Sequence, residues 1–321
     1  MRDHSMESLS DYIESLNVDE ATRLELLRKL ASMREKGLNI MITGATGSGK
    51  SSTINALFRA DKARVGEGAS PETQEIARYD YDGMTLWDTP GLGDGEDADK
   101  RHMEAIRRKL QETNNDGGQL IDAVLVVLDA GSRDLGSSYK LINEVVLPGM
   151  KDASRVVVAL NQADMALKGR HWNDSTNQPD AVLLEKLDEM CAVVRNRIRE
   201  STGIDVEPVF YCAGYKEEGE QRAPYNLAKL LARIVKRIPA SKRLLVADNM
   251  NRDKASYASD DGRSDYHGEI VSAFRESCRD IGESVGETLG SIGGKIGKEL
   301  GGKAGRAIGD IIGRLGEWLF S

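Results

Sequence analysis

The glycine-rich segment GATGSGKSS, which begins at Gly44, contains groups that suit phosphate binding. Its glycines allow backbone N–H groups to surround an anion at the start of a helix, and Lys50 can reach the terminal phosphates of a nucleotide. Ser51 offers a hydroxyl for magnesium. The runs LNIMIT before the segment and SSTINALFR after it are the strand and helix that such a loop requires. We expect nucleotide contacts from Gly44, Gly47, Ser48, Gly49, Lys50, Ser51 and Ser52.

A second motif, DTPGLGDG, begins at Asp88, the last residue of the predicted strand MTLWD. A carboxylate at this point of a sheet lies beside the glycine-rich loop and can hold magnesium through a water molecule. The N–H of Gly91 can donate to the terminal phosphate. Because this motif follows both a phosphate loop and a strand, the two motifs together predict a nucleoside triphosphatase in which Asp88 and Gly91 also contact the nucleotide.

The polar segment VGEGASPETQEI lies between these motifs and has no apolar periodicity. It suits a mobile loop whose Thr73 completes the magnesium shell when the terminal phosphate is present. Ser70 is a competing candidate, and an ordinary surface turn is the alternative. The cofactor that we expect is Mg²⁺. We expect Lys50, Thr73 and Gly91 to act on the reacting phosphate, and Ser51, Thr73 and Asp88 to bind the metal.

The segment NQAD begins at Asn161, after the predicted strand RVVVAL, and suits recognition of guanine. Asp164 can accept hydrogen bonds from N1–H and N2–H of guanine, a pair of donors that adenine lacks. Asn161 can hold the loop and meet the base edge, and the stem of Gln162 can cover the base. After the next predicted strand, Cys212 precedes Ala213, whose N–H can donate to the guanine oxygen. An ordinary polar loop end is the alternative for NQAD.

The ordered set GATGSGKS, Thr73, DTPG, NQAD and CA resembles the Era-like GTPases of the translation-factor-related (TRAFAC) class. Its closest likeness is to a bacterial branch described as YfjP-like or ribosome-binding-type GTPases. The resemblance covers residues from about 38 to 240. It implies a Ras-like fold, binding of guanine nucleotides and magnesium-dependent hydrolysis of GTP.

Several residues depart from the pattern of these families. Leu92 follows DTPG at the position where Ras-like switches place a water-orienting glutamine, and a leucine cannot polarise water. We therefore expect slow intrinsic hydrolysis, which a further group would accelerate. That group could come from the segment GDGEDADKR, where Asp94 and Glu96 are candidates, from a second GTPase domain or from a partner. Gly47 stands where relatives that use potassium carry asparagine, which argues against activation by a monovalent cation. Gln162 replaces a lysine, and Cys212 a serine.

Short apolar runs alternate with helical stretches between residues 38 and 242. Such alternation predicts an α/β fold with a mostly parallel sheet and helices on both faces. Amphipathic helical spacing before Gly37 predicts helices that pack on this domain, and the polar stretch DNMNRDKASYASDDGRSDYHG predicts a linker. The predicted domains are 1–37, a helical extension; 38–242, a Ras-like GTPase domain; 243–268, a polar linker; and 269–321, a glycine-zipper helical tail.

The tail contains twelve glycines between residues 282 and 316, most of them beside an apolar row at helical spacing. Each glycine inside a helix costs about 1 kcal/mol relative to alanine, so twelve cost on the order of 10 kcal/mol. A helix here must be ordered by close packing against itself, another copy of the chain or a bilayer. Assembly or membrane association, packing within the chain, and disorder are all left open.

The composition sets further limits. A formal net charge of −8 argues against a broad basic surface, so we do not expect nucleic acid as a partner. The three cysteines are far apart in the sequence, which is typical of a reduced, cytoplasmic chain. The first residues include no apolar run typical of a secretory signal, and no run of 18 apolar residues predicts a spanning helix. Peripheral attachment to the inner membrane is left open.

We therefore expect a GTP-binding switch that slowly hydrolyses GTP and whose switch loops are released when the terminal phosphate is lost. The expected partners are GTP and GDP, with a homo-oligomer through the GTPase domain or the tail, and a membrane surface bound through 269–321, left open. The alternative is a self-assembling or membrane-acting effector in which GTP gates the tail and hydrolysis is incidental. Use of ATP is disfavoured by Asp164.

Overall fold

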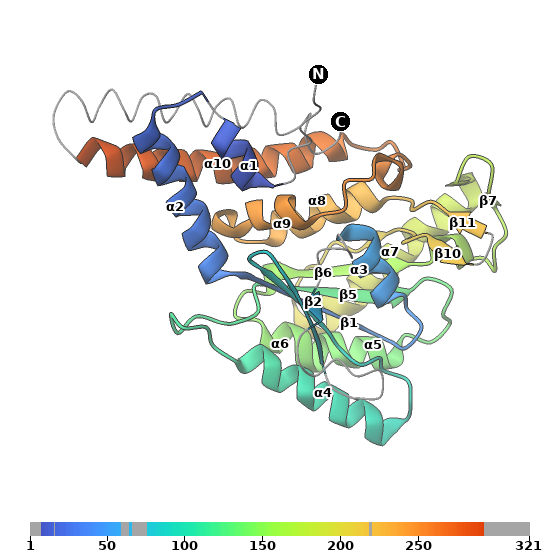
Figure 1. The fold of residues 1–321 in the computed structure, drawn as a ribbon. Helices are drawn as coiled ribbons and strands as arrows, with labels where there is room; N and C mark the ends of the chain where they lie inside the picture. The colour runs from blue at the N-terminus through green and yellow to red at the C-terminus, as the bar shows by residue number, and fades with distance from the viewer. Residues whose placement is uncertain (1–7, 16, 59–63, 66–75, 218–219, 292–321) are drawn as a thin grey trace.

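The computed structural model describes residues 8–15, 17–58, 64–65, 76–217 and 220–291 of the 321-residue chain. Within these residues, a central sheet has the strand order β2-β3-β4-β1-β5-β6-β9 (Figure 1). The strands are β1 (Leu38–Gly44), β2 (Arg64–Val65), β3 (Ala77–Tyr81), β4 (Met84–Asp88), β5 (Ala123–Asp129), β6 (Val156–Asn161) and β9 (Val209–Phe210). The pairs from β4 to β9 are parallel, whereas β2 and β3 are joined antiparallel at one edge.

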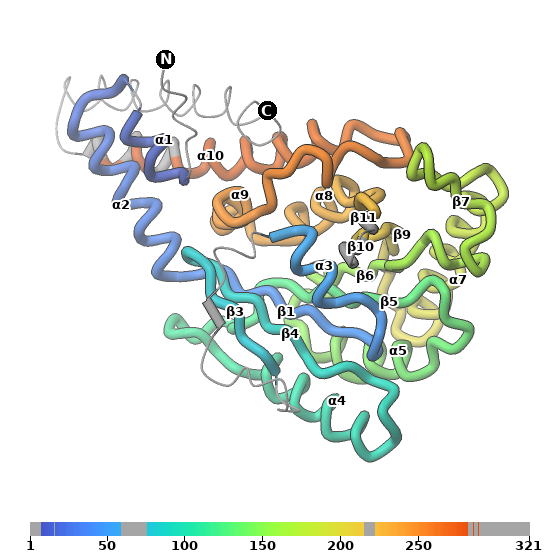
Figure 2. Tube along the Cα trace, turned by 45° about the vertical axis from the view of Figure 1, so that its right-hand side comes forward, coloured from blue at the N-terminus to red at the C-terminus, as the bar shows by residue number. Residues whose placement is uncertain are grey.

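The parallel strands are apolar along their whole length because both faces of the sheet are covered. In β5 the sequence AVLVVLD is buried from Ala123 to Leu128. One core lies between the sheet and the helices α1, α2, α3, α8, α9 and α10, and the second lies between the opposite face and α4, α5 and α7. Figure 2 shows the two helical layers with the sheet between them. The prediction of an α/β fold with a mostly parallel sheet is confirmed.

The helices form one layer on each face of the sheet. The first layer contains α1 (Leu9–Ser15), α2 (Glu20–Lys36), α3 (Lys50–Leu57), α8 (Leu227–Arg237), η5 (Ala240–Lys242), α9 (Leu244–Asn249), η6 (Lys254–Tyr257) and α10 (Tyr266–Ser291). The second layer contains α4 (Glu96–Gln111), α5 (Gly136–Leu141), η2 (Ile142–Val146), α6 (Leu147–Gly149) and α7 (Ala181–Thr202). Short turns form η3 (Ala153–Arg155) and η4 (Ala163–Met165). Two antiparallel hairpins pair β7 (Trp172–Asn173) with β8 (Gln178–Pro179), and β10 (Tyr215–Glu217) with β11 (Glu220–Arg222).

The N-terminal helices lie against the first layer. Asp19 caps α2 by accepting a hydrogen bond from the N–H of Thr22, and Gly37 ends the helix with φ of 63°. Apolar residues of α1 and α2 are buried against α9 and α10. They line one apolar cavity with residues of those helices: Leu9, Tyr12, Ile13, Leu26, Leu30, Met33, Leu244, Cys278 and Ile281. These helices therefore extend the first core.

The segment 243–268, where the sequence predicts a linker, is packed against the first layer. Three of its polar residues, Asp248, Asn249 and Ser256, are buried, and the first two hydrogen-bond to distant parts of the chain. Asp248, 1% exposed, accepts from the N–H of Leu9 at 3.0 Å and from Arg34 at 2.8 Å. Asn249 donates to the carbonyl of Asp82 at 2.9 Å. The polar composition of this segment predicted a linker. The structure instead places it against the first layer, where polar side chains bond to residues that are distant in the sequence.

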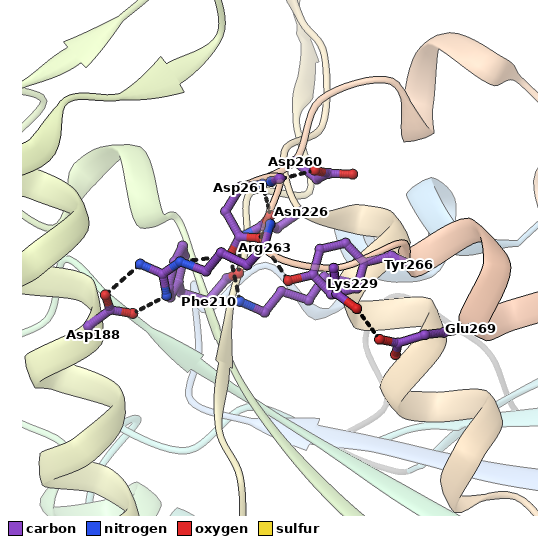
Figure 3. A network of polar contacts seen from close by, with 11 residues as sticks. Asp188, Phe210, Asn226, Lys229, Asp260, Asp261, Arg263, Tyr266 and Glu269 are labelled. Carbon is purple, nitrogen blue, oxygen red and sulfur yellow. Dashed lines mark hydrogen bonds and ion pairs between the residues drawn. The ribbon is translucent and has the colours of Figure 1, made fainter.

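The start of the predicted tail belongs to α10, which lies over α8 and α9 on the side away from the sheet (Figure 1). Lys229 of α8 is joined to Asp261, and Tyr266 at the start of α10 donates to the same carboxylate (Figure 3). Residues 292–321 lie outside the described part of the chain, so the glycine zipper stays a prediction.

None of the helices that the structure describes has an apolar stretch long enough to cross a bilayer.

Candidate nucleotide-binding site

The predicted site residues Asp88 and Asn161 lie at the C-terminal ends of parallel strands, on the same side of the sheet as the glycine-rich loop. Ile42 pairs with Asp88 across β1 and β4, and Asp129 pairs with Asn161 across β5 and β6. The loop after β1 leads directly into α3 at Lys50. Ligands bind at this end of open parallel sheets because the loops there meet helix N-termini.

Backbone geometry explains the glycines of the phosphate loop. Gly49 has φ of 84° and is the N-cap of α3, and a Cβ there would lie 2.2 Å from Asn161 Nδ2. A Cβ on Gly44 would lie 2.1 Å from the carbonyl oxygen of Val127. Gly47 has φ of 76° with open space around it. Ser48 is buried, whereas Ser51 and Ser52 are exposed in the first turn of α3.

Lys50 lies across the loop. Its Nζ donates to the carbonyl oxygens of Gly44 at 3.3 Å and Ala45 at 3.0 Å. Burial lowers the pKa of Lys50, and the charges of Asp88 and Asp94 oppose that shift. Burial likewise raises the pKa of Asp88, against the effects of Lys50 and Ser51. The structure therefore collects a cation and carboxylates in a partly desolvated space, where charge interactions are strengthened.

The predicted metal ligands meet at this point. Ser51 Oγ lies 3.5 Å from Asp88 Oδ2. Within the described residues, Asp88 Oδ1 is buried and has no hydrogen-bond partner. Hydroxyl and carboxylate oxygens are the ligands that Mg²⁺ prefers, so this donor set fits the metal. Thr73 and its competitor Ser70 lie outside the described residues.

The segment after Asp88 is joined to the phosphate loop through its backbone. The N–H of Thr46 donates to the carbonyl of Leu92 at 2.7 Å, and the N–H of Leu92 donates to Gly44 at 3.3 Å. Gly91 packs so closely that a Cβ would lie 2.6 Å from the Cα of Thr46. The side chain of Leu92 is 1% exposed and belongs to the second core, so it points away from the loop.

Two residues near this segment were not predicted from the sequence. His102 of α4 contacts the carbonyl oxygen of Gly91 through Nδ1 at 2.9 Å, and Thr46 Oγ1 donates to Asp94 at 3.3 Å. The other candidate, Glu96, pairs with Lys100 of its own helix, which leaves Asp94 beside the loop. A histidine inside an amphipathic helix gives no sequence signal that distinguishes it from a core residue.

Asn161 joins three segments that are distant in the sequence. Its Nδ2 donates to the carbonyl of Ser48 at 3.0 Å, and its Oδ1 accepts from the N–H of Ala213 at 2.9 Å. The N–H that the sequence assigns to the guanine oxygen is therefore bound to Asn161. Gln162, expected to cover the base, donates from Nε2 to the carbonyl of Gly47 at 2.7 Å.

Asp164 lies beside Asn161 in η4, with its side chain 11% exposed. The thiol of Cys212 donates to Asp164 Oδ1 at 3.3 Å, and the guanidinium of Arg222 donates to Oδ2. Burial raises the pKa of Cys212 well above its usual range, and the charge of Asp164 adds to this shift, so the thiol keeps its proton. Arg222 was missed because the sequence places no motif in its hairpin.

Comparison with known proteins gives matches over the same region. Residues 39–162 match the family model described as 50S ribosome-binding GTPase. The tRNA modification GTPase MnmE of Legionella pneumophila (strain Paris) is 30% identical over 197 residues, which cover 58% of this chain and 42% of that protein. MnmE of the Corby strain is 29% identical over the same shares. The chain thus aligns with about two fifths of these curated relatives.

Among solved structures, the G domain of the T. maritima FeoB iron transporter is 22% identical with a TM-score of 0.35, covering 62% of this chain and 98% of that one. A dimerization-deficient mutant of Toc33 from Arabidopsis thaliana is 16% identical with a TM-score of 0.44, covering 73% and 96%.

The matches to the family model and to MnmE do not support the alternative in which the tail is the active element, and they leave the Era-like and YfjP-like subtypes as predictions. They support binding of guanine nucleotides and GTP hydrolysis as the general properties of the matched domain. Proteins of this kind generally use Mg²⁺. The sequence matches support the presence, in this chain, of a P-loop GTPase domain of the TRAFAC class.

Proposed function

We propose that this protein is a switch that binds GTP and hydrolyses it slowly to GDP and phosphate with Mg²⁺, and that residues 38–242 form the GTPase domain. The contacts of Asn161 are the observation that carries this proposal. Its carboxamide joins the phosphate loop at Ser48 to the loop of Ala213, with Asp164 beside it. One side chain thereby sets the distance between the proposed phosphate and base sites.

The phosphate end of the site uses the loop from Gly44 to Ser52. Its backbone turns at glycines and opens into the N-terminus of α3, where N–H groups and the helix dipole favour an anion. Lys50 Nζ, which contacts loop carbonyls in the structure, is positioned to exchange them for phosphate oxygens. Gly91, which packs against Thr46 of the loop, is proposed to donate its N–H to the terminal phosphate.

Ser51 and Asp88 would hold Mg²⁺, with Thr73 proposed as a third ligand. When bound, the metal would neutralise charge on the phosphates. The burial that raises the pKa of Asp88 leaves its carboxylate short of hydrogen-bond partners, which suits it to receive a cation. The positive charge of Lys50 offsets the negative charge of Asp88 beside it, which favours binding of an anionic triphosphate at the loop.

The base end selects guanine through Asp164. A carboxylate accepts two hydrogen bonds from N1–H and N2–H of guanine, whereas the corresponding edge of adenine presents an acceptor at N1. Such a pairing discriminates strongly because the wrong base leaves buried polar groups unpaired. Gln162 supports the phosphate loop through Gly47, so its contribution to the base is its stem.

Hydrolysis proceeds by attack of water on the γ-phosphorus as the bond to the departing GDP oxygen breaks. Leu92 cannot assist this water because its side chain is an alkyl group held in the second core. We infer that intrinsic turnover is slow and that a further group is needed for acceleration. Asp94, which accepts a hydrogen bond from Thr46 beside the loop, is our candidate for that group.

Phosphate release from GTP by the purified full chain tests this function. We expect slow release that requires Mg²⁺, is competed by GDP and is unaffected by excess ATP. Lys50→Ala should abolish nucleotide binding, whereas Lys151→Ala, an exposed lysine at the end of the sheet away from the loop, serves as the matched control. Absence of guanine-nucleotide binding by the folded wild-type protein would refute the proposal.

A further inference from the structure

Both carboxylate oxygens of Asp164, the residue proposed to select guanine, already have donors in the structure. Cys212 donates to Oδ1 at 3.3 Å, and Arg222 Nη1 donates to Oδ2. The Asp164 side chain is 11% exposed and that of Arg222 is 24% exposed, so the ion pair is partly shielded from water. A guanine base that uses the same two oxygens must compete with the arginine.

Arg222 is held in this place by the fold around it. It is the last residue of β11 and pairs with Tyr215 across the hairpin. Reciprocal backbone hydrogen bonds of 3.0 Å join Cys212 to Tyr225 and close the base of the segment that carries the hairpin. Asn177 adds hydrogen bonds of 3.1 Å to the carbonyls of residues 223 and 224.

A second carboxylate lies on the other side of Arg222. Its Nη2 contacts Asp174 Oδ1 at 2.5 Å, and the Asp174 side chain is 76% exposed. The guanidinium thus bridges one shielded and one solvent-exposed carboxylate. If Arg222 leaves Asp164, its charge is still paired with Asp174 at the protein surface. Displacement of the arginine therefore does not leave an unpaired buried cation.

The chemistry of the two competitors is closely matched. The N1–H and N2–H donors of guanine belong to a planar guanidine-like unit, and the arginine guanidinium presents planar N–H donors to carboxylates in the same way. Adenine offers no such pair of donors. Only a base with the paired N–H donors of guanine can therefore replace the arginine and still leave Asp164 with hydrogen-bond partners.

We propose that Arg222 is a latch on the guanine site, which occupies Asp164 while no nucleotide is bound and is displaced toward Asp174 when guanine enters. This proposal rests on the proposed function. The latch reduces the fraction of protein that is ready to bind, which weakens the apparent affinity by the same factor. It also raises the selectivity for guanine, because an adenine base cannot take the place of the arginine.

The test measures binding of a fluorescent GDP to nucleotide-free full-length protein by stopped flow, together with thermal unfolding. Arg222→Gln should bind GDP more tightly, by about fivefold, with faster association, since one partly exposed ion pair no longer competes. Without nucleotide, the same variant should melt at a lower temperature than wild type because Asp164 has lost its cation. A misfolded variant would lose both binding and stability.

Two further variants complete the test. Arg222→Lys keeps the charge but cannot bridge two carboxylates as a planar fork, so an intermediate affinity is expected. Arg195→Gln removes an arginine that pairs with Asp205 near the end of α7, and it should leave GDP binding unchanged. An independent measurement titrates wild-type protein with guanosine, which carries no charge. The affinity for guanosine should rise as the potassium chloride concentration is raised, because salt weakens the ion pair between Arg222 and Asp164.

The outcomes separate the two proposals. If folded wild-type protein does not bind GDP, both the proposed function and the proposed latch are wrong. Wild-type binding with equal or weaker binding by folded Arg222→Gln overturns the latch alone and assigns Arg222 to the support of Asp164. If Arg222→Gln does not fold, guanosine affinity that stays constant or falls with salt overturns the latch.

Discussion

Asn161 Nδ2 donates a hydrogen bond of 3.0 Å to the carbonyl oxygen of Ser48, across a separation of 113 residues in the sequence. Asn161 is 3% exposed and Ser48 is fully buried. The bond fixes the end of β6 against the phosphate loop. Because buried polar groups are costly to leave unpaired, this contact couples the order of the loop to the order of the base site.

Replacement of Asn161 by aspartate tests this coupling. The carboxylate has nearly the same shape but cannot donate to Ser48, and we expect the free energy of unfolding to fall by about 1–3 kcal/mol. Binding of GDP should weaken in parallel. Urea unfolding and GDP titration measure the two effects, with Asn55→Asp on the exposed face of α3 as the control. Unchanged stability of the Asn161 variant would contradict the coupling.

Gly49→Ala is expected to damage the site more than Gly47→Ala. Both residues have positive φ, so both variants carry backbone strain. Only at Gly49 would the new methyl group meet a neighbour, Asn161 Nδ2, at 2.2 Å. The difference in unfolding free energy and in GDP affinity between the two variants therefore reports the close approach to Asn161. Equal losses would show that backbone strain alone explains the glycine.

Breaking the ion pair between Lys229 and Asp261 is expected to destabilise the contact between α8 and the segment that precedes α10 (Figure 3). Nζ lies 2.6 Å from Oδ2, the lysine side chain is 11% exposed and the aspartate side chain is fully buried. Lys229→Met removes the cation nearest to this buried carboxylate, which keeps its hydrogen bond from Tyr266, so the loss should stay below the cost of about 3–5 kcal/mol for a fully unpaired buried charge. Adding Asp261→Asn should recover part of the loss. Arg195→Gln, which breaks an exposed pair, should change the stability much less.

The same pair predicts a dependence on pH. Burial opposes ionisation of Asp261, but hydrogen bonds from Lys229 and Tyr266 outweigh it and lower the pKa of the carboxylate in the folded chain. Its stabilising contribution is therefore present above the unfolded pKa of about 3.9 and is lost as the pH falls through the lower folded value. Unfolding midpoints should show wild type and the double variant converging in acid. A constant difference from neutral to acid pH would contradict this assignment.

The three cysteines are expected to react slowly with alkylating reagents in the folded protein. Burial raises the pKa of Cys191 and of Cys278 to about 12, and that of Cys212 well above its usual range. The thiolate is the reactive form, so labelling at neutral pH should proceed mainly after denaturation. Mass spectrometry of maleimide-treated protein, native and denatured, measures this. Rapid native labelling of Cys212 would contradict the buried contact with Asp164.

Leu92→Gln is not expected to create a faster GTPase. The backbone bonds of residue 92 to Thr46 and Gly44 direct its side chain into the second core, so the new amide would be buried among apolar groups. This burial should lower stability by about 1–3 kcal/mol. Phosphate release and thermal unfolding measure the two effects, with Leu92→Met as the apolar control. A large gain in turnover would show that the side chain leaves the core.

The parts of the site that depend on local geometry were predictable from the sequence. A strand, a glycine-rich turn and a helix start follow one another as the sequence predicts, and backbone N–H groups at such a helix start favour an anion. Strands that are apolar throughout likewise predicted a parallel sheet with both faces covered, and hence that Asp88 and Asn161 would meet the loop at one edge.

Contacts between distant residues were decided only by the tertiary structure. Arg222 reaches Asp164 because a hairpin closes over the end of β9, and no periodicity or spacing encodes that approach. Asp248 lies in a segment whose composition predicts a linker, yet its carboxylate is buried because two distant donors satisfy it. Sequence patterns show which backbone hydrogen bonds an element makes and which of its faces is apolar enough to be buried. The partner of a buried polar side chain depends on which elements the fold brings beside it.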